Sequence, residues 1–228
     1  LTAAAARAAR GKKAKPGVAL FLHDIEDRVI ELEAALKDKT YHPKPYRIFE
    51  ICDPKERMIC AADFRDRVVH HALCNELEPL FERGYIHDTY ACRPEKGTHA
   101  ALTRTQHFLR RSPYYLKLDI HKFFDSVDHA ILTSLIERKV KDPDAMWLTK
   151  VIIDHQVPWT PRGKGLPIGN LTSQHFANDY LSGLDHFVKE HLQVSGYLRY
   201  MDDMVLFDRQ KEKLWRAAER VERYLEEN

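Results

Sequence analysis

The spacing of apolar side chains predicts a helix, a hairpin and a second helix in the first third of the chain. Apolar residues three or four positions apart share one face of a helix, and this spacing occurs at Ile25, Val29, Leu32 and Leu36. A longer apolar face follows at Val68, Val69, Ala72, Leu73, Leu77, Leu80 and Phe81. Between the two helices, residues 46–64 alternate apolar and polar positions on both sides of Asp53-Pro54, which predicts two strands joined by a turn.

The rest of the chain has the pattern strand, helix, helix, hairpin, helix. A strand is predicted at 114–120, and a helix follows on Ile131, Leu132, Leu135 and Ile136. Residues 158–169 hold three Pro and three Gly and predict a loop. Next come one long helix from about Asn170, a hairpin from Gly196 to Phe207, and a last helix on Leu214, Ala218, Val221 and Leu225. This order predicts an α+β fold whose sheet carries helices on one face.

The charge of the chain is nearly balanced, so a nucleic-acid surface has to come from local clusters of basic residues. The formal net charge is +2 over 228 residues. One cluster stands at the start, where no acid precedes Asp24, and comprises Arg7, Arg10, Lys12, Lys13 and Lys15. A frayed, solvated leader and an arm that contacts RNA both fit this cluster.

Composition also bears on compartment and completeness. Cys52, Cys60, Cys74 and Cys92 form no Cys-x-x-Cys pair, which favours reduced thiols in a cytoplasmic protein over a metal site. No apolar run approaches the ~18 residues of a membrane span, so no membrane association is expected. The chain starts at Leu1 without Met and stops in a charged helix, which suggests a fragment.

Two adjacent acids, Asp202 and Asp203, stand between apolar stretches that otherwise read as strand. Two like charges in an apolar setting repel and lose hydration, so a cation is expected beside them. Asp119 ends the predicted strand 114–120. If the strands are neighbours, three carboxylates meet at one edge of the sheet and could bind Mg²⁺. Two such ions, about 3.5 to 4 Å apart, support in-line displacement at phosphorus.

Several motifs together resemble those of reverse transcriptases. Tyr200-Met201-Asp202-Asp203 resembles their catalytic hairpin, residues 118–129 (LDIHKFFDSVDH) resemble their first metal-binding strand, and residues 165–174 (GLPIGNLTSQ) are similar to their nucleotide-binding loop and helix. Residues 54–73 and 90–102 resemble the fingers region of bacterial reverse transcriptases related to group II intron enzymes. The match covers nearly all of residues 40–208, in order.

The resemblance is greatest to the branch found in diversity-generating retroelements. Ile168-Gly169 followed by Ser173-Gln174 matches that branch, whereas most other reverse transcriptases have Gln before this Gly. The resemblance implies an RNA-directed DNA polymerase that copies a template RNA into cDNA from deoxynucleoside triphosphates. It also implies inaccurate copying of adenines and a small basic accessory protein as a partner.

The resemblance implies a right-hand polymerase fold, of which this chain is expected to contain the fingers and palm only. The fingers are expected at 1–92 and 128–166, and the palm at 93–127 and 167–228. The palm is expected to be an antiparallel sheet backed by helices, incomplete at its C-terminal end, with the thumb absent.

The resemblance also assigns roles to individual residues. Asp119 and Asp202 are expected to ligate two Mg²⁺ ions, Asp203 to contribute more weakly, and the Ile120 carbonyl to complete a site. The residues expected to bind the nucleotide are Lys55, Arg57, Phe123, Phe124, Ile168, Gly169 and Gln174, with Phe124 filling the space under the sugar. Arg93 is expected to contact the template or to form a structural salt bridge. Asp125, Ser126 and Asp128 are expected to cap the helix that follows them.

Two rival interpretations stay open from the sequence. One is a reverse transcriptase of another bacterial branch, such as a retron or a defence system. The other is a polymerase-like fold that binds RNA without synthesis, although such a scaffold has no need of a repulsive acid cluster.

Overall fold

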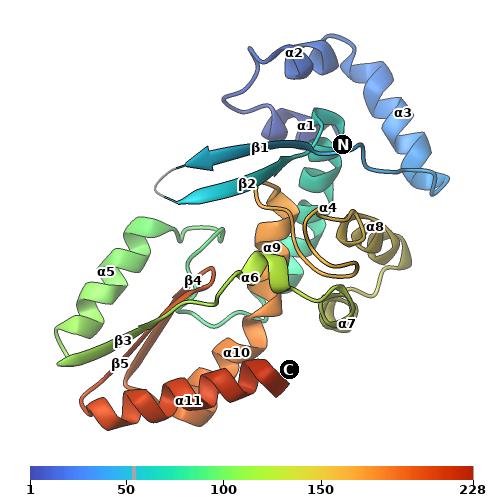
Figure 1. Ribbon diagram of the computed structural model, residues 1–228. Helices are drawn as coiled ribbons and strands as arrows, with labels where there is room; N and C mark the ends of the chain where they lie inside the picture. Colours follow the sequence, from blue (N-terminus) through green and yellow to red (C-terminus); the bar gives the residue numbers. More distant parts are fainter. Residues whose placement is uncertain (53–54, 228) are drawn as a thin grey trace. The chain divides into compact units, whose positions relative to one another are not determined.

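The computed structural model describes residues 1–52 and 55–227 (Figure 1). The chain divides into two compact units. Unit 1 comprises Leu1–Leu80 and Phe124–His175, and unit 2 comprises Phe81–Phe123 and Phe176–Asn228. The unit boundaries fall within 12 residues of those expected for fingers and palm, whose assignment to the units stays a prediction. None of the helices among the described residues is both long and apolar enough to cross a membrane.

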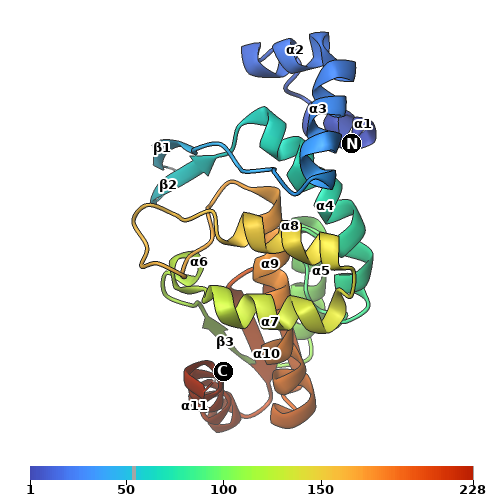
Figure 2. The same ribbon diagram turned by 90° about the vertical axis from the view of Figure 1, so that its right-hand side faces the viewer.

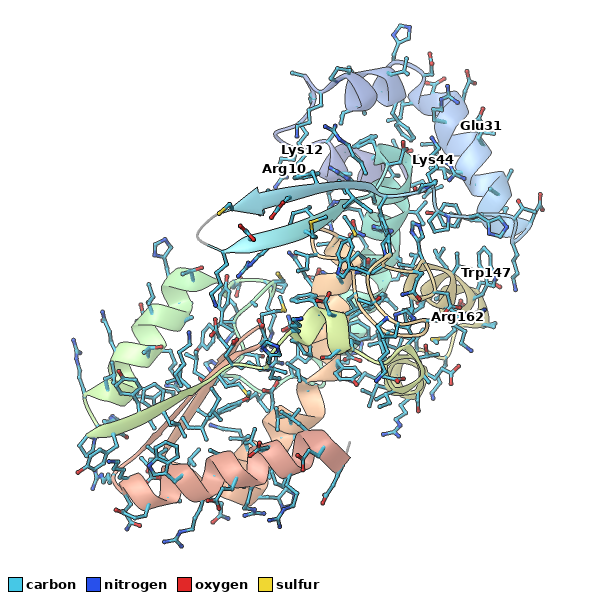
Figure 3. All side chains as sticks on the ribbon, in the orientation of Figure 1. Arg10, Lys12, Glu31, Lys44, Trp147 and Arg162 are labelled. Carbon is cyan, nitrogen blue, oxygen red and sulfur yellow. The ribbon has the colours of Figure 1, made fainter. Side chains whose placement is uncertain are left out.

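Unit 1 begins with helices α1 (Thr2–Ala8), α2 (Pro16–His23) and α3 (Ile25–Lys37). The interpretation of the leader as frayed is wrong for its first nine residues. Ala4, Ala5 and Ala8 are buried, because alanines at helical spacing form a face that packs closely. Arg7 donates from Nη1 to Oδ1 of Asn75 at 2.6 Å. Arg10 and Lys12, labelled in Figure 3, belong to the exposed segment after α1.

The predicted first hairpin is present as β1 (Arg47–Cys52) and β2 (Glu56–Ala61), paired antiparallel from Arg47↔Ala61 to Cys52↔Glu56. The turn expected at Asp53-Pro54 lies outside the described residues. All six residues of β1 are exposed, so the alternation in the sequence does not correspond to a buried face. The helix predicted next is α4 (Phe64–Glu82), and its apolar face is buried.

The second segment of unit 1 carries α7 (His129–Lys139), α8 (Pro143–Ile153) and the loop predicted at 158–169. Helices α7 and α8 lie side by side (Figure 2). Asp128 caps α7, since its side chain accepts from the amides of Ala130 and Ile131, as predicted. Asp125 lies inside the short helix α6 (Phe123–Ser126) and accepts a hydrogen bond from Trp159 Nε1 at 3.1 Å. Contrary to the prediction, it therefore does not cap α7.

Unit 2 contains a three-stranded antiparallel sheet in the order β3-β5-β4. The strands are β3 (Tyr114–Leu118), β4 (Gly196–Tyr200) and β5 (Asp203–Asp208). The second predicted hairpin is therefore confirmed. The strand predicted from residue 114 is the direct neighbour of β5, with Tyr114↔Asp208 and Leu118↔Met204 in register.

Helices contact both faces of this sheet, so the expectation of helices on one face is wrong. On one face, Phe207 stacks on Phe108 of α5 (Thr98–Leu109) with ring centroids 5.1 Å apart. Arg199 points to the other face and contacts Asp185 of α10 (Ser182–Phe187), because successive side chains of a strand alternate between faces. The last helix, α11 (Lys211–Glu227), contacts β3 and β5.

The long helix expected from Asn170 is divided into three parts: α9 (Leu171–Tyr180), α10, and a π-helical turn at Val188–Leu192. Leu181 separates the first two with ψ of 0°, far from the helical value near −42°. Its amide reaches the Ala177 carbonyl at 3.3 Å. The apolar period continues through this break, which explains why the sequence predicts one helix.

Candidate functional site

Three aspartates stand at the same end of the sheet in unit 2. Met204 and Leu118 are partners in the ladder between β5 and β3, and one further step in this register sets Asp119 opposite Asp203. Tyr200 pairs with Asp203, so Met201 and Asp202 form the two-residue turn between β4 and β5. The three aspartates therefore stand at one end of the sheet because strands far apart in the sequence are neighbours.

Lys117 is a fourth charged residue at this end of the sheet, and its role is not predicted from the sequence. Its Nζ lies 2.7 Å from Oδ1 of Asp203, diagonally across β3 and β5. The hydrogen bond and the charge of Asp203 raise the pKa of Lys117, and the charges of Asp119 and Asp202 add to this effect. Lys117 supplies part of the positive charge that the adjacent acids were expected to need. It lies two residues before Asp119, on the same strand face, and this spacing could have revealed it.

The carboxylates at this end of the sheet suit a hard cation by their chemistry, because Mg²⁺ takes oxygen ligands from a few carboxylates and from substrate phosphates. Asp119 is exposed, and Asp202 and Asp203 are half-exposed. Among the described residues, however, no three His, Cys, Asp or Glu side chains are gathered closely enough to hold a metal ion. The aspartates thus provide suitable donors without a closed cage of protein ligands.

The turn that carries Asp202 has an uncommon backbone conformation. Met201 has φ of 59°, in the left-handed region that costs a side-chain-bearing residue about 1 to 2 kcal/mol. A positive φ at the first central residue is the feature of type II′ hairpin turns, where glycine is usual. The surrounding structure must therefore hold Met201 in this conformation.

In unit 1, three backbone hydrogen bonds hold the loop 158–169 in place, and two of them involve residues expected to bind the nucleotide, Phe124 and Ile168. The Leu166 amide donates to the Phe124 carbonyl at 2.7 Å, and the Cys60 amide donates to the Ile168 carbonyl at 2.9 Å. A third bond links Gly165 to Val127 at 2.8 Å. The loop 158–169 is therefore attached on one side to α6 and on the other to β2 of the exposed hairpin.

Gly169 lies against this hairpin and has a structural reason to be glycine. Its φ is 111°, and a Cβ there would lie 2.9 Å from Cγ2 of Ile59 and 3.4 Å from the carbonyl oxygen of Cys60. Lys55 and Arg57 are exposed on the hairpin, and Gln174 is half-buried on α9. The loop, hairpin and helix thus carry most of the expected nucleotide contacts within one unit.

Phe123 and Arg93, both in unit 2, have side chains that are buried in the protein. The Phe123 side chain is 3% exposed and lies near Tyr180. Arg93 binds Glu82 through Nη2 at 2.7 Å and through Nε at 2.9 Å. Its Nη1 donates to the carbonyl of Ile86 and to Thr89. Arg93 thus forms the structural salt bridge, and its contact with template stays a prediction without structural support.

Comparison with known proteins identifies the family. A sequence profile described as reverse transcriptase (RNA-dependent DNA polymerase) matches residues 43–228. The group II intron-encoded protein LtrA of Lactococcus lactis subsp. cremoris is 28% identical over 170 residues, which are 72% of this chain and 28% of LtrA. A 91 kDa protein in the cob intron of Schizosaccharomyces pombe is 26% identical over 172 residues, covering 73% of this chain and 21% of that protein.

A solved structure shares the fold. Telomerase from Candida albicans, in complex with a fragment of telomeric RNA, superposes with a TM-score of 0.55 at 11% identity, covering 80% of this chain and 40% of the telomerase chain. The chain thus spans less than half the length of these relatives. Its α+β fold, with antiparallel sheets and packed helices, is that of reverse transcriptases, and the profile extends over most of its residues. The chain belongs to the reverse transcriptase family.

Proposed function

We propose that this chain carries the polymerisation chemistry of an RNA-directed DNA polymerase, which copies a template RNA into DNA from deoxynucleoside triphosphates. The observation that supports the proposal most is the placement of Asp119, Asp202 and Asp203 at the same end of the sheet. Family membership and the relatives encoded in group II introns support it independently.

Within this proposal the aspartates hold the metal ions. Asp119 and Asp202 provide carboxylate oxygens to two Mg²⁺ ions, Asp203 contributes more weakly, and the Ile120 carbonyl completes one site. Bound Mg²⁺ activates an attacking hydroxyl and stabilises the leaving phosphate oxygen. Lys117 competes with the metal for Asp203, because its Nζ lies 2.7 Å from Oδ1, and this is why Asp203 is the weaker ligand.

The nucleotide is proposed to be held by residues of unit 1. Lys55 and Arg57 bind the triphosphate, where the guanidinium offers a planar fork and the ammonium a point charge. Phe124 excludes a 2′-hydroxyl beneath the sugar. Ile168, Gly169 and Gln174 contact the incoming nucleotide from the loop and from α9.

The proposal is tested by comparing two aspartates of the same strand in the complete enzyme. Asp202→Asn should abolish primer extension while leaving the melting temperature without Mg²⁺ at least as high as in the parent, because it removes a ligand and a like charge. Asp208→Asn, at the other end of β5, should do the opposite. Asp208 accepts from the amide and hydroxyl of Ser195 and from the Gln210 amide, so its loss should lower stability by roughly 1 to 3 kcal/mol but preserve activity.

Primer extension on an RNA template and thermal melting are measured on the same preparations. An active Asp202→Asn enzyme contradicts the catalytic assignment. Loss of activity in both variants, at a temperature where both are folded, also contradicts it, because the effect would then not be specific to the proposed ligand.

The branch of the family is the finer part of the proposal. The residues Ile168-Gly169 and Ser173-Gln174 favour a diversity-generating retroelement enzyme, which would take a small basic accessory protein as a partner. A second candidate, favoured by the 28% identity to LtrA, is an intron-encoded enzyme without adenine-directed errors.

Ile168→Gln distinguishes the two candidates. Glutamine can hold the incoming nucleotide by a hydrogen bond worth about 0.5 to 1.5 kcal/mol, whereas isoleucine offers apolar contact only. The retroelement enzyme should therefore make roughly two- to tenfold fewer errors opposite template adenine after the substitution, since about 1.4 kcal/mol corresponds to a factor of ten. Sequencing of cDNA made by the parent and by the variant on one template measures this. A low adenine error rate already in the parent favours the second candidate, whereas equal adenine error spectra in the two enzymes leave Ile168 a packing residue.

A further inference from the structure

Arg199 is a charged residue in the interior of unit 2, two positions before the turn that carries Asp202. Its side chain and that of Asp185 on α10 are both fully buried. Nε of Arg199 donates to Oδ1 of Asp185 at 2.8 Å, and Nη2 donates to Oδ2 at 2.6 Å. This is a bidentate contact between the guanidinium and the carboxylate.

Such a pair is not explained by stability alone. Desolvation of two buried charges offsets most of their attraction, and apolar replacements of buried pairs are often neutral or stabilising. Burial opposes the charged form of Arg199, yet the Asp185 carboxylate keeps the pKa of Arg199 above its ordinary value. The charged pair therefore persists in the interior, and its other contacts show what it does there.

The remaining donors of Arg199 reach the catalytic turn and helix α9. Nη1 donates to the carbonyl oxygen of Met201 at 2.8 Å and to Oδ1 of Asn178 at 3.2 Å. Nη2 donates to the Asn178 carbonyl at 3.2 Å. Asn178 is itself fixed, since its Nδ2 donates to the Ala91 carbonyl at 2.7 Å. Arg199 thus ties the turn to α9 and α10.

The bond to Met201 acts where the turn needs support. The carbonyl of Met201 belongs to the peptide that continues into Asp202, and Met201 has the left-handed φ of 59°. The strand before the turn is fixed as well, because the Arg199 amide donates to the Asp88 carbonyl at 3.0 Å and the Tyr90 amide donates to the Arg199 carbonyl at 3.1 Å. The orientation of the peptide between Met201 and Asp202 is therefore set by the buried Arg199 side chain, whose own backbone is held in place by hydrogen bonds.

We propose that Arg199 is a positioning residue that holds the turn in the conformation presenting the Asp202 carboxylate to Mg²⁺, with Asp185 and Asn178 fixing its guanidinium. This inference rests on the proposed function, because it gives Asp202 a metal to bind. Lysine could neutralise Asp185 but has a single ammonium on a flexible stem, so it could not also hold the Met201 carbonyl in the same geometry.

The test compares three variants of the complete enzyme with the parent. Arg199→Lys keeps the charge but loses the fork. Arg199→Met combined with Asp185→Asn removes both charges together, so that no buried charge is left unpaired. Tyr197→Phe is the matched control, because the Tyr197 hydroxyl donates to Oδ1 of Asp185 at 2.8 Å in the same cluster without touching the turn.

Two quantities are measured besides melting temperature and near-UV circular dichroism. One is Mn²⁺ affinity, followed by electron paramagnetic resonance without nucleotide. The other is the Mg²⁺ concentration for half-maximal single-nucleotide addition. Arg199→Lys and the double variant should bind Mn²⁺ at least tenfold more weakly and need at least tenfold more Mg²⁺. Their kcat at subsaturating metal should fall, while KM for the nucleotide stays within twofold. Tyr197→Phe should melt earlier but keep both metal values of the parent.

If either folded Arg199 variant has the Mn²⁺ affinity and the Mg²⁺ requirement of the parent, the proposal is overturned and Arg199 is a packing residue. Equal weakening in Tyr197→Phe also overturns it, since any loosening of the interior would then suffice. If Arg199→Lys fails to fold, the double variant decides. Asp202→Asn, measured alongside, separates the two proposals: unchanged Mn²⁺ affinity in that variant means that Asp202 is not a ligand, and the proposed metal site fails whatever Arg199 does.

Discussion

Phe123 and Phe124 are neighbours in the chain but occupy different environments. Phe123 is 3% exposed and lies beside Tyr180 in unit 2. Phe124 is half-buried in unit 1, where its carbonyl accepts from the Leu166 amide at 2.7 Å. Phe124 is the more exposed of the two residues, so it is the better candidate for contact with a nucleotide sugar.

Phe124→Val should raise the ratio of ribonucleotide to deoxyribonucleotide incorporation in the complete enzyme. A space that opens beneath the sugar removes a steric conflict, and a difference of one small group in a pocket is worth about 10- to 200-fold in discrimination. The measurement is single-nucleotide addition with each substrate on an RNA template. Phe123→Leu serves as the control and should lower stability without changing the ratio, and an unchanged ratio in Phe124→Val rules out the steric role.

His70 on α4 is a buried histidine that favours its neutral form. It is 2% exposed, and among the described residues no hydrogen-bond partner reaches its Nδ1. Burial, with smaller contributions from His155, His71 and Arg67, lowers the pKa of His70 to about 3. The unfolded chain has a histidine pKa of about 6.5, so it takes up this proton before the folded chain does. The stability that His70 confers is therefore full above pH 6.5 and is lost as the pH falls toward 3.

Unfolding in urea should reveal this loss. Between pH 6.5 and 5 the free energy of unfolding should fall by about 2 kcal/mol on account of His70, at about 1.4 kcal/mol per pH unit. His70→Leu should remove this part of the slope, while His71 and His155, whose pKa values are also lowered by burial, keep the remainder. Equal slopes for the parent and His70→Leu would contradict the buried neutral state.

Among the elements, the β1–β2 hairpin depends on the loop 158–169 for its position within unit 1. All of β1 is exposed, so the hairpin has little buried apolar surface of its own. The bond from the Cys60 amide to the Ile168 carbonyl and the approach of Gly169 to Ile59 attach β2 to the loop. The residues proposed to hold the triphosphate and those proposed to contact the base are thereby connected through backbone.

Gly169→Ala should weaken this connection. The substituted residue would be strained at φ of 111° and its Cβ would meet Ile59, so a loss of roughly 1 to 3 kcal/mol in stability is expected. Hydrogen exchange should show faster exchange of the Cys60 amide. Gly17→Ala in α2, where a Cβ meets nothing within 4 Å, should instead be neutral or stabilising by up to about 1 kcal/mol. Unchanged exchange at Cys60 in Gly169→Ala would show that the close approach does not hold the hairpin.

At the scale of the whole molecule, both units are discontinuous in the sequence. Residues 124–175 complete the unit that begins the chain, and residues 176–228 complete the unit that contains 81–123. Neither unit is therefore a contiguous segment, and a single cut in the chain can leave one unit whole while depriving the other of its partner strands.

A fragment of residues 1–175 should illustrate this dependence. It retains every residue of unit 1 but lacks β4, β5 and α11, so β3 has no strand to pair with. Hydrogen exchange should show protection maintained in α4, α7 and α8 and lost in residues 98–118, with residues 1–228 as the reference. Loss of protection throughout the fragment would contradict the expectation that unit 1 folds without residues 176–228.

Local spacing in the sequence determined many elements and most of the proposed site. The two hairpins, the strand before Asp119 and the Asp128 cap all follow from neighbours within a few positions, because hydrogen bonds in turns and caps are local. The acids are predicted as a cluster because two of them are adjacent in the sequence and the third follows a predicted strand. The family motifs contain the same local information, so they are recognisable from the sequence alone.

Only the tertiary structure decided which side chains support that site. The Asn178 side chain bonds to Ala91 across 87 positions, and the partners of Lys117, Arg93 and Arg199 likewise come from other elements. The packing of the alanine-rich first helix, the break at Leu181 and the helices on both faces of the sheet also depend on such contacts. A charged side chain inside a strand has no signature in the local pattern, because its partner is set by which elements pack together rather than by spacing along the chain.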